Sequence, residues 1–90
     1  MNDYKLIIEH TENMFKVGWC PVCNQGWQVI MKDEGTERLF VLCEECLSVW
    51  DSPLDIKMPH KASSATNLME ALPSYKEVER EGWVQYLIAN

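Results

Sequence analysis

The chain has few basic residues and no long apolar run. Lysine and arginine together number 8, against 14 aspartates and glutamates, so the formal net charge is -6. Because phosphate binding depends on clustered Lys and Arg, this composition disfavours direct binding to nucleic acid. No apolar stretch approaches the length of a membrane span. The start of the chain also lacks the basic segment, apolar stretch and cleavage site of a secretion signal, so we expect a cytoplasmic protein without a membrane partner.

Other absences argue against catalysis. We find no Ser-His-Asp pattern, no glycine-rich phosphate loop and no cysteine left over as a nucleophile. The two histidines, His10 and His60, lie in polar surroundings and are expected to be solvated. The sequence therefore predicts a protein that is not an enzyme. Its 90 residues predict one small domain, in the size range where folds often depend on a metal, disulfides or a partner.

All the cysteines fall into two pairs, in Cys20-Pro-Val-Cys23 and Cys43-Glu-Glu-Cys46, with 19 residues between the pairs. This spacing fits the C-x2-C-x15-20-C-x2-C pattern typical of zinc sites. Four thiolates satisfy tetrahedral Zn²⁺ and leave no open position for a catalytic water. We therefore expect one structural zinc ion, held by Cys20, Cys23, Cys43 and Cys46. Structural disulfides and a redox-active pair are the alternatives, which a reducing compartment and the lack of a βαβ pattern around the first pair disfavour.

The hydrophobic pattern predicts a β-hairpin between the two cysteine pairs. Residues 27–32 alternate between two faces, and residues 39–42 are apolar on both faces and run directly into the second pair. Residues 33–37 supply a turn with a central glycine. Each pair then lies beside one strand, as in a zinc ribbon. A third strand is expected at 47–50.

Outside the hairpin the pattern is weaker. We interpret residues 1–53 as a first strand plus the zinc ribbon, 54–65 as a loop and 66–90 as a helical C-terminal extension, all within a single domain. The expected fold class is α+β: a small zinc ribbon, with a hairpin or a three-stranded antiparallel sheet, on which the extension packs. Packing is expected because a strand that is apolar on both faces cannot leave one face in water.

Within the extension, a helix is expected at 75–81. Ser74 can cap its N-terminus, and Glu77 can complete a capping box. Residues 67–72 are interpreted as a short helical turn. Residues 83–90 fit a helix face and an alternating strand equally well, and both alternatives stay open.

Glycine and tryptophan provide two further expectations. Gly18 and Gly26 bracket the first cysteine pair and are expected to allow tight turns through positive φ, while Gly82 is expected to end the helix. Tryptophans can stack on nucleic-acid bases, but without a basic groove we interpret these as residues of the core or of the cysteine turns. They are Trp19, Trp27, Trp50 and Trp83.

Acidic side chains are the candidates for contact with a partner. Opposite electrostatic fields speed encounter and select partners, so the expected partner is a basic protein such as a toxin or nuclease. An ordinary solvated surface is the alternative explanation for each residue. The candidates are Asp33, Glu34, Glu37, Glu44, Glu45 and Asp51.

Two resemblances bear on function. The pattern Cys20-Pro-Val-Cys23, Gly26-Trp27, Cys43-x-x-Cys46-x-x-x-Trp50-x-x-Pro53 and Gly82-Trp83 resembles small bacterial zinc-ribbon proteins. Some of these look like immunity proteins that neutralise toxins delivered between neighbouring cells. The resemblance implies an inhibitor that covers the basic active site of a nuclease by mimicking phosphate charge.

The second resemblance lies in the hairpin. The segment from Asp33-Glu34 through Phe40-Val-Leu-Cys43-Glu-Glu-Cys46 to Trp50 resembles the zinc ribbon of transcript-cleavage elongation factors. In those factors an Asp-Glu pair on the hairpin tip enters the RNA polymerase site and helps to hold a catalytic Mg²⁺, which implies the same role for Asp33 and Glu34. Solvated turn carboxylates are the alternative explanation. A structural subunit of a larger complex is the third hypothesis, and it predicts an exposed apolar patch.

Overall fold

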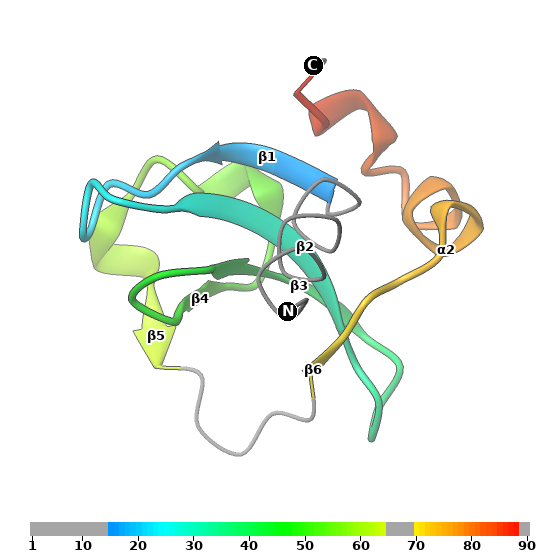
Figure 1. The fold of residues 1–90 in the computed structure, drawn as a ribbon. Helices are drawn as coiled ribbons and strands as arrows, with labels where there is room; N and C mark the ends of the chain where they lie inside the picture. The colour runs from blue at the N-terminus through cyan, green and yellow to red at the C-terminus, as the bar shows by residue number, and fades with distance from the viewer. Residues whose placement is uncertain (1–14, 65–69, 89–90) are drawn as a thin grey trace, which may run out of the picture.

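The computed structural model describes residues 15–64 and 70–88, which form an antiparallel sheet with a short helix beside it (Figure 1). The strand order is β1-β2-β3-β4-β5, and β6 pairs with β2. The strands are β1 (Phe15–Trp19), β2 (Trp27–Asp33), β3 (Leu39–Cys43), β4 (Ser48–Trp50), β5 (Ser63–Ser64) and β6 (Glu70–Ala71). The helix is α2 (Tyr75–Arg80), and the short 3-10 turns are η1 (Pro53–Asp55), η2 (Pro59–Lys61) and η3 (Val84–Tyr86). This small sheet with one short helix agrees with the α+β class, although the sheet has more strands than the sequence predicts.

The β2–β3 hairpin is the centre of the sheet. Its register pairs Gln28 with Cys43 and Lys32 with Leu39. Alternate residues of each strand enter two different hydrophobic clusters, one on each face of the hairpin. Every residue of β3 is buried, as its apolar pattern predicts. The predicted strands at 27–32 and 39–42, and the third strand before Ser52, are therefore confirmed.

The C-terminal extension covers one face of the hairpin. Val78 of α2 is fully buried in the cluster that contains Ile30 and Trp50, and Trp83 and Tyr86 pack against the same cluster. The predicted packing of the extension on the sheet is thus confirmed. At the edge of the sheet, the backbone N–H of Ile88 donates to the Lys16 carbonyl oxygen at 2.9 Å.

Helix α2 begins at Tyr75, as the sequence predicts, and ends at Arg80, one residue before the predicted end. The Ser74 hydroxyl accepts from the Glu77 N–H at 3.2 Å, and the Glu77 carboxylate accepts from the Ser74 N–H at 2.8 Å, which completes the capping box. Gly82, with φ +80°, follows the last turn. The Lys32 ammonium lies 2.9 Å from the Glu77 carboxylate and ties β2 to the helix.

Two segments differ from their sequence-based interpretation. Within the expected helical turn at 67–72, residues 67–69 lie outside the described part of the chain, but Glu70–Ala71 forms β6 and pairs with Lys32 and Asp33. Within the described residues, β1 pairs with β2 only as far as Ile30, and β6 pairs with backbone groups farther along β2. The expected loop at 54–65 contains 3-10 turns and β5.

Among the described residues, those that follow Gly82 form neither an α-helix nor a β-strand. Residues 83–88, which fitted helix and strand equally, form the 3-10 turn η3 followed by extended backbone. The first strand, expected near the start of the chain, and His10 lie outside the described residues. His60, in η2, is exposed, as expected.

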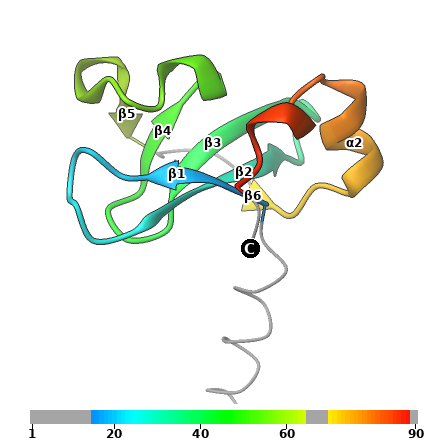
Figure 2. The same cartoon turned by 90° about the horizontal axis from the view of Figure 1, so that it is seen from above.

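The two ends of the hairpin carry different features. Figures 1 and 2 show the loop after β1 and the loop after β3 together at one end of the sheet. The tip of the hairpin lies at the other end, with β6 and α2 close to it. The cysteines therefore gather at one end of the molecule, and the predicted acidic tip lies at the opposite end.

Candidate metal centre

The first cysteine pair lies in a tight turn that follows β1. The Cys20 N–H donates to the Gly26 carbonyl oxygen at 2.9 Å, and the Asn24 N–H donates to the Cys20 carbonyl oxygen at 3.0 Å. Asn24 has a φ of +56°, which asparagine tolerates better than most residues. The Val22 N–H donates to Cys20 Sγ at 3.3 Å.

The second pair repeats this geometry after β3. The Leu47 N–H donates to the Cys43 carbonyl oxygen at 3.1 Å, and Leu47 has a φ of +62°. The backbone N–H groups of Glu45 and Cys46 both lie 3.4 Å from Cys43 Sγ. In each turn the first cysteine sulfur accepts from backbone N–H groups, and both sulfurs face the other turn.

The four sulfurs form one compact cluster. All four Sγ atoms lie within 4.8 Å of one another, with Cys20 and Cys46 at 3.7 Å and Cys23 and Cys43 at 3.6 Å. These separations exceed the roughly 2.05 Å of a disulfide bond. Sulfurs at about 2.3 Å from a tetrahedral metal would be about 3.8 Å apart. The cluster therefore fits a single cation with four thiolate ligands, and the predicted four-cysteine site forms in the structure.

The cysteines differ in their affinity for protons. Burial raises the pKa of the Cys43 thiol to about 12, although the two backbone donors partly offset this effect. Burial also disfavours the Cys46 thiolate, but hydrogen bonds with Ser48, whose Oγ lies 3.2 Å from the sulfur, outweigh it and lower the pKa to about 7. A cation must displace the Cys43 proton to bind, so its affinity depends on pH.

Gly26 allows the two turns to meet, but not for the predicted reason. Neither Gly18 nor Gly26 has a positive φ, so that expectation is wrong; Asn24 and Leu47 adopt this conformation instead. What Gly26 provides is space, because an added Cβ would lie 2.6 Å from Glu45 Cγ and 3.1 Å from Cys43 Sγ. Gly18 likewise makes room for the buried Gln28 side chain, whose Oε1 would be 2.6 Å from a Cβ.

The six predicted contact residues fall into two groups. Glu44 and Glu45 lie beside the metal cluster, and Glu44 is used within the fold, since its carboxylate accepts from the Trp27 N–H at 3.0 Å. The other four lie toward the opposite end of the sheet, about 10 to 15 Å away along the strands. These are Asp33, Glu34, Glu37 and Asp51. The acidic candidates therefore do not make one continuous surface.

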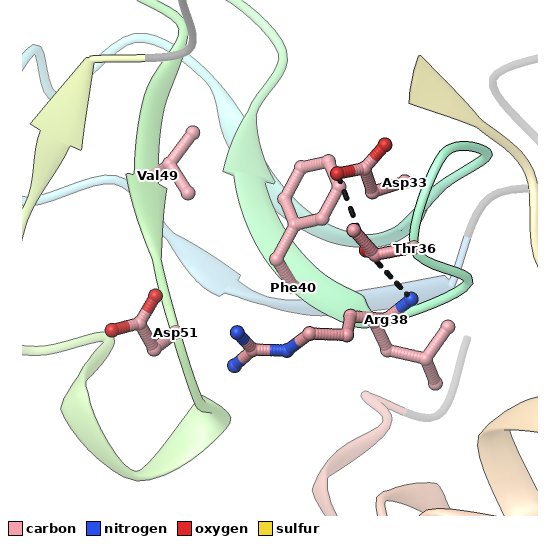
Figure 3. Close-up of a pocket in the computed structure, with 7 residues that line it drawn as sticks. Asp33, Thr36, Arg38, Phe40, Val49 and Asp51 are labelled. Carbon is pink, nitrogen blue, oxygen red and sulfur yellow. Dashed lines mark hydrogen bonds between the residues drawn. The ribbon is translucent and has the colours of Figure 1, made fainter. Parts of the chain in front are cut away.

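The acidic end contains a pocket that sequence reasoning missed. Asp33 and Asp51 line it together with Thr36, Arg38 and Phe40 (Figure 3). The Asp33 carboxylate accepts from the Gly35 N–H at 3.0 Å and from the Thr36 hydroxyl at 3.3 Å. No local pattern in the sequence indicates this pocket, because its residues come together only through the pairing of β3 with β4.

Comparison of the chain with protein-family models, with curated proteins and with solved structures finds no match. In the part of the chain that the structure describes, no helix is both long and apolar enough to cross a membrane. The geometry alone therefore defines the class of site: a four-cysteine cluster, similar to that of a zinc ribbon, that can hold a metal ion.

Proposed function

We propose that this protein is a non-enzymatic zinc-binding module for protein-protein interaction, and that it neutralises a basic partner such as a nuclease toxin, as an immunity or inhibitor protein does. One observation supports the proposal most strongly. The side chains of Glu34, Glu37 and Asp51 are exposed at the acidic end, and none of them forms an ion pair within the described residues. Such carboxylates are available to meet positive charge on another molecule.

Zinc is the metal that we propose for the cysteine cluster. Soft thiolates in a tetrahedral arrangement select zinc or iron over hard cations such as calcium and magnesium. Zinc bound by four cysteines has no open coordination position and serves folding rather than catalysis. Metal analysis of the purified protein is expected to find one zinc ion per chain. An iron-loaded protein would be coloured and would contradict this assignment.

The acidic end supports an inhibitory role through its charge. A nuclease active site must attract phosphate, so it carries positive charge. Carboxylates on the hairpin are attracted to that positive charge, which accelerates association of the two proteins. Salt weakens this attraction by screening the charges. The cysteine cluster links the hairpin to the turn after β1 at one end, and the Lys32–Glu77 ion pair links it to α2 near the other.

A transcription-associated role is the alternative. In that reading Asp33 and Glu34 act on RNA polymerase from the hairpin tip. Glu34 is exposed, which the role requires, whereas the Asp33 carboxylate already accepts two hydrogen bonds within its own turn. Replacing both residues with alanine and measuring polymerase-dependent transcript cleavage tests this alternative directly, since unchanged cleavage would exclude it.

Affinity capture of the tagged, metal-loaded protein from its own cells tests the proposal. We expect a basic nuclease to be recovered in a one-to-one complex that dissociates as salt is raised. Recovery of polymerase subunits instead would favour the alternative, and recovery of no basic protein would contradict the proposal.

A pair of matched variants makes this capture specific. Glu34→Gln/Glu37→Gln removes two charges from the acidic end, and Glu79→Gln/Glu81→Gln removes two exposed charges from α2 and its end. We expect the first variant to lose the partner and the second to retain it. An equal loss with both would show that net charge alone drives the capture.

A further inference from the structure

The pocket at the acidic end combines a buried apolar floor with charged walls. Phe40 and Val49 form the floor, and each is less than a tenth exposed. Figure 3 shows Asp33 on one side and Asp51 on the other, with Phe40 between them. The pocket has a volume of about 150 Å³. A cavity of this size can hold a group as large as benzene, so it suits one side chain rather than a backbone segment.

The walls carry more negative than positive charge. Asp33 and Asp51 oppose a single cation, Arg38, for which the described residues record no ion pair. The two hydrogen bonds that the Asp33 carboxylate accepts leave about half of its lone-pair sites open. Asp51 has no hydrogen-bond partner for its carboxylate among the described residues. Both carboxylates can therefore accept hydrogen bonds from a ligand.

Arg38 indicates which kind of group fits. Its guanidinium lines the free space of the pocket and extends toward Asp51 (Figure 3), so a planar cation on an aliphatic stem already lies at this wall. Arg38 is exposed and can turn away, whereas Asp33 is fixed by its turn. A second cation with an aliphatic stem could lay the stem on Phe40 and place its head between the two carboxylates.

We propose that this pocket receives one basic side chain, arginine above lysine, from the protein partner. This inference rests on the proposed function, because it specifies how the acidic end recognises a basic protein. Arginine is favoured because its planar fork can form bidentate hydrogen bonds with a carboxylate while it stacks on an aromatic ring. Arg38 then acts as a competitor that the incoming side chain displaces.

The test measures binding of a single amino acid to the zinc-loaded full chain by two-dimensional NMR. The probe is Nα-acetyl-arginine methylamide, and Nα-acetyl-citrulline methylamide is the neutral control of nearly equal shape. We expect saturable, millimolar binding of the arginine probe, with shifts centred on the amides of Thr36, Arg38 and Asp51. The citrulline probe is expected to bind at least tenfold more weakly. Equal binding of both probes, or no saturable shift, would overturn the proposal.

Charge-matched variants separate the pocket from the general acidic field. Asp33→Asn/Asp51→Asn is expected to weaken arginine binding at least tenfold, because it removes both negative charges from the pocket. Asparagine keeps an oxygen that can accept the hydrogen bonds of the turn, so the turn itself should be preserved. Glu34→Gln/Glu37→Gln removes the same charge outside the pocket lining and is expected to change binding less than twofold. Asp51→Asn alone avoids the turn altogether and is expected to weaken binding severalfold. Equal effects of the two double variants would refute a pocket.

Arg38 provides a test of opposite sign. Arg38→Gln is expected to strengthen arginine binding severalfold, because a competing cation is lost. If this variant instead weakened arginine binding, or if Nα-acetyl-glutamate methylamide bound to the wild type through Arg38, the assignment of a basic side chain would be wrong. These measurements need no partner, so the pocket can be confirmed even if capture finds no basic protein, and the two failures are distinguishable.

Discussion

Replacing Gly26 with alanine is expected to weaken metal binding and folding together. The added Cβ would lie 2.6 Å from Glu45 Cγ, 2.9 Å from Glu45 Cβ and 3.1 Å from Cys43 Sγ. The end of the Glu45 side chain is exposed and can turn away, but its Cβ is fixed by the backbone. Cys43 Sγ is fixed by the cluster. Relief of the contact therefore requires the two cysteine turns to move apart, which strains the site that joins them.

The size of this effect follows from the cost of overpacking. Inserting a methyl group into a closely packed site costs about 1–3 kcal/mol. Because metal binding and folding are coupled, this cost corresponds to about 5- to 150-fold weaker Zn²⁺ binding. For a domain of this size, each kcal/mol also lowers the melting temperature by about 4–8 °C. Competition with a chromogenic chelator measures the first quantity, and thermal unfolding in excess Zn²⁺ measures the second.

Gly35→Ala is the matched control for this experiment. Its added Cβ would meet only Asp33 Oδ1, at 3.5 Å, which is an ordinary contact, so near wild-type behaviour is expected. Adding Glu45→Ala to the Gly26 variant should restore part of the affinity, because it removes the nearest atom. If Gly26→Ala bound zinc as tightly as the wild type, the close contact between the two turns would be refuted.

Four further results are expected. Chelation of the metal should unfold the sheet, with recovery on adding Zn²⁺, because the cluster joins the ends of β1 and β3; circular dichroism checks this, and a folded metal-free protein would contradict it. Ser74→Ala should lower the free energy of unfolding by about 1 kcal/mol in denaturant titrations, whereas Ser64→Ala, whose hydroxyl makes no hydrogen bond among the described residues, should not. Glu77→Gln should flatten the acid dependence of stability, since hydrogen bonds from Ser74 and Lys32 lower the Glu77 pKa below its model-compound value of 4.5. Glu77 therefore stabilises the fold fully above its pKa in the unfolded chain, and this stabilisation is lost as the pH falls through its lower pKa in the folded protein. Measuring the unfolding of the wild type and of the Glu77→Gln variant between about pH 3 and 6 tests this expectation. Leu47→Asn should stabilise the zinc-loaded protein by about 1 kcal/mol in the same titrations, because leucine at φ +62° is strained; a destabilised variant would show that the exposed leucine contributes contacts instead.

Sequence reasoning succeeded where structure follows from neighbouring residues. The two Cys-x-x-Cys pairs, the alternation at 27–32 and the capping residues Ser74 and Glu77 each act within a few positions of the chain. The cysteine turns and the helix cap are closed by hydrogen bonds between residues two to four positions apart, and the strand is indicated by its own alternation. For this reason the cysteine cluster, the hairpin and α2 all lie where the patterns predict them.

Sequence reasoning failed where structure depends on distant partners. Glu70–Ala71 has no strand pattern and is a strand only because it pairs with the end of β2. The role of Gly26 was misassigned for a similar reason: the atoms that exclude a Cβ belong to Glu45 and Cys43 across the hairpin. A glycine in the sequence indicates an unusual requirement, but it does not say whether that requirement is conformation or space.

The acidic end shows the same limit with a functional consequence. Asp33 and Asp51 were both predicted as contact residues from their charge, but their shared pocket follows only from the pairing of β3 with β4. Strand β3 carries Phe40 in the pocket floor and, three residues later, Cys43 in the metal cluster, a span of about 10 Å. The metal should therefore position the pocket as well as the fold. An isolated peptide with the residues of the hairpin tip would carry the same carboxylates but, without β4 and the metal, would have no pocket in which arginine could be told from citrulline.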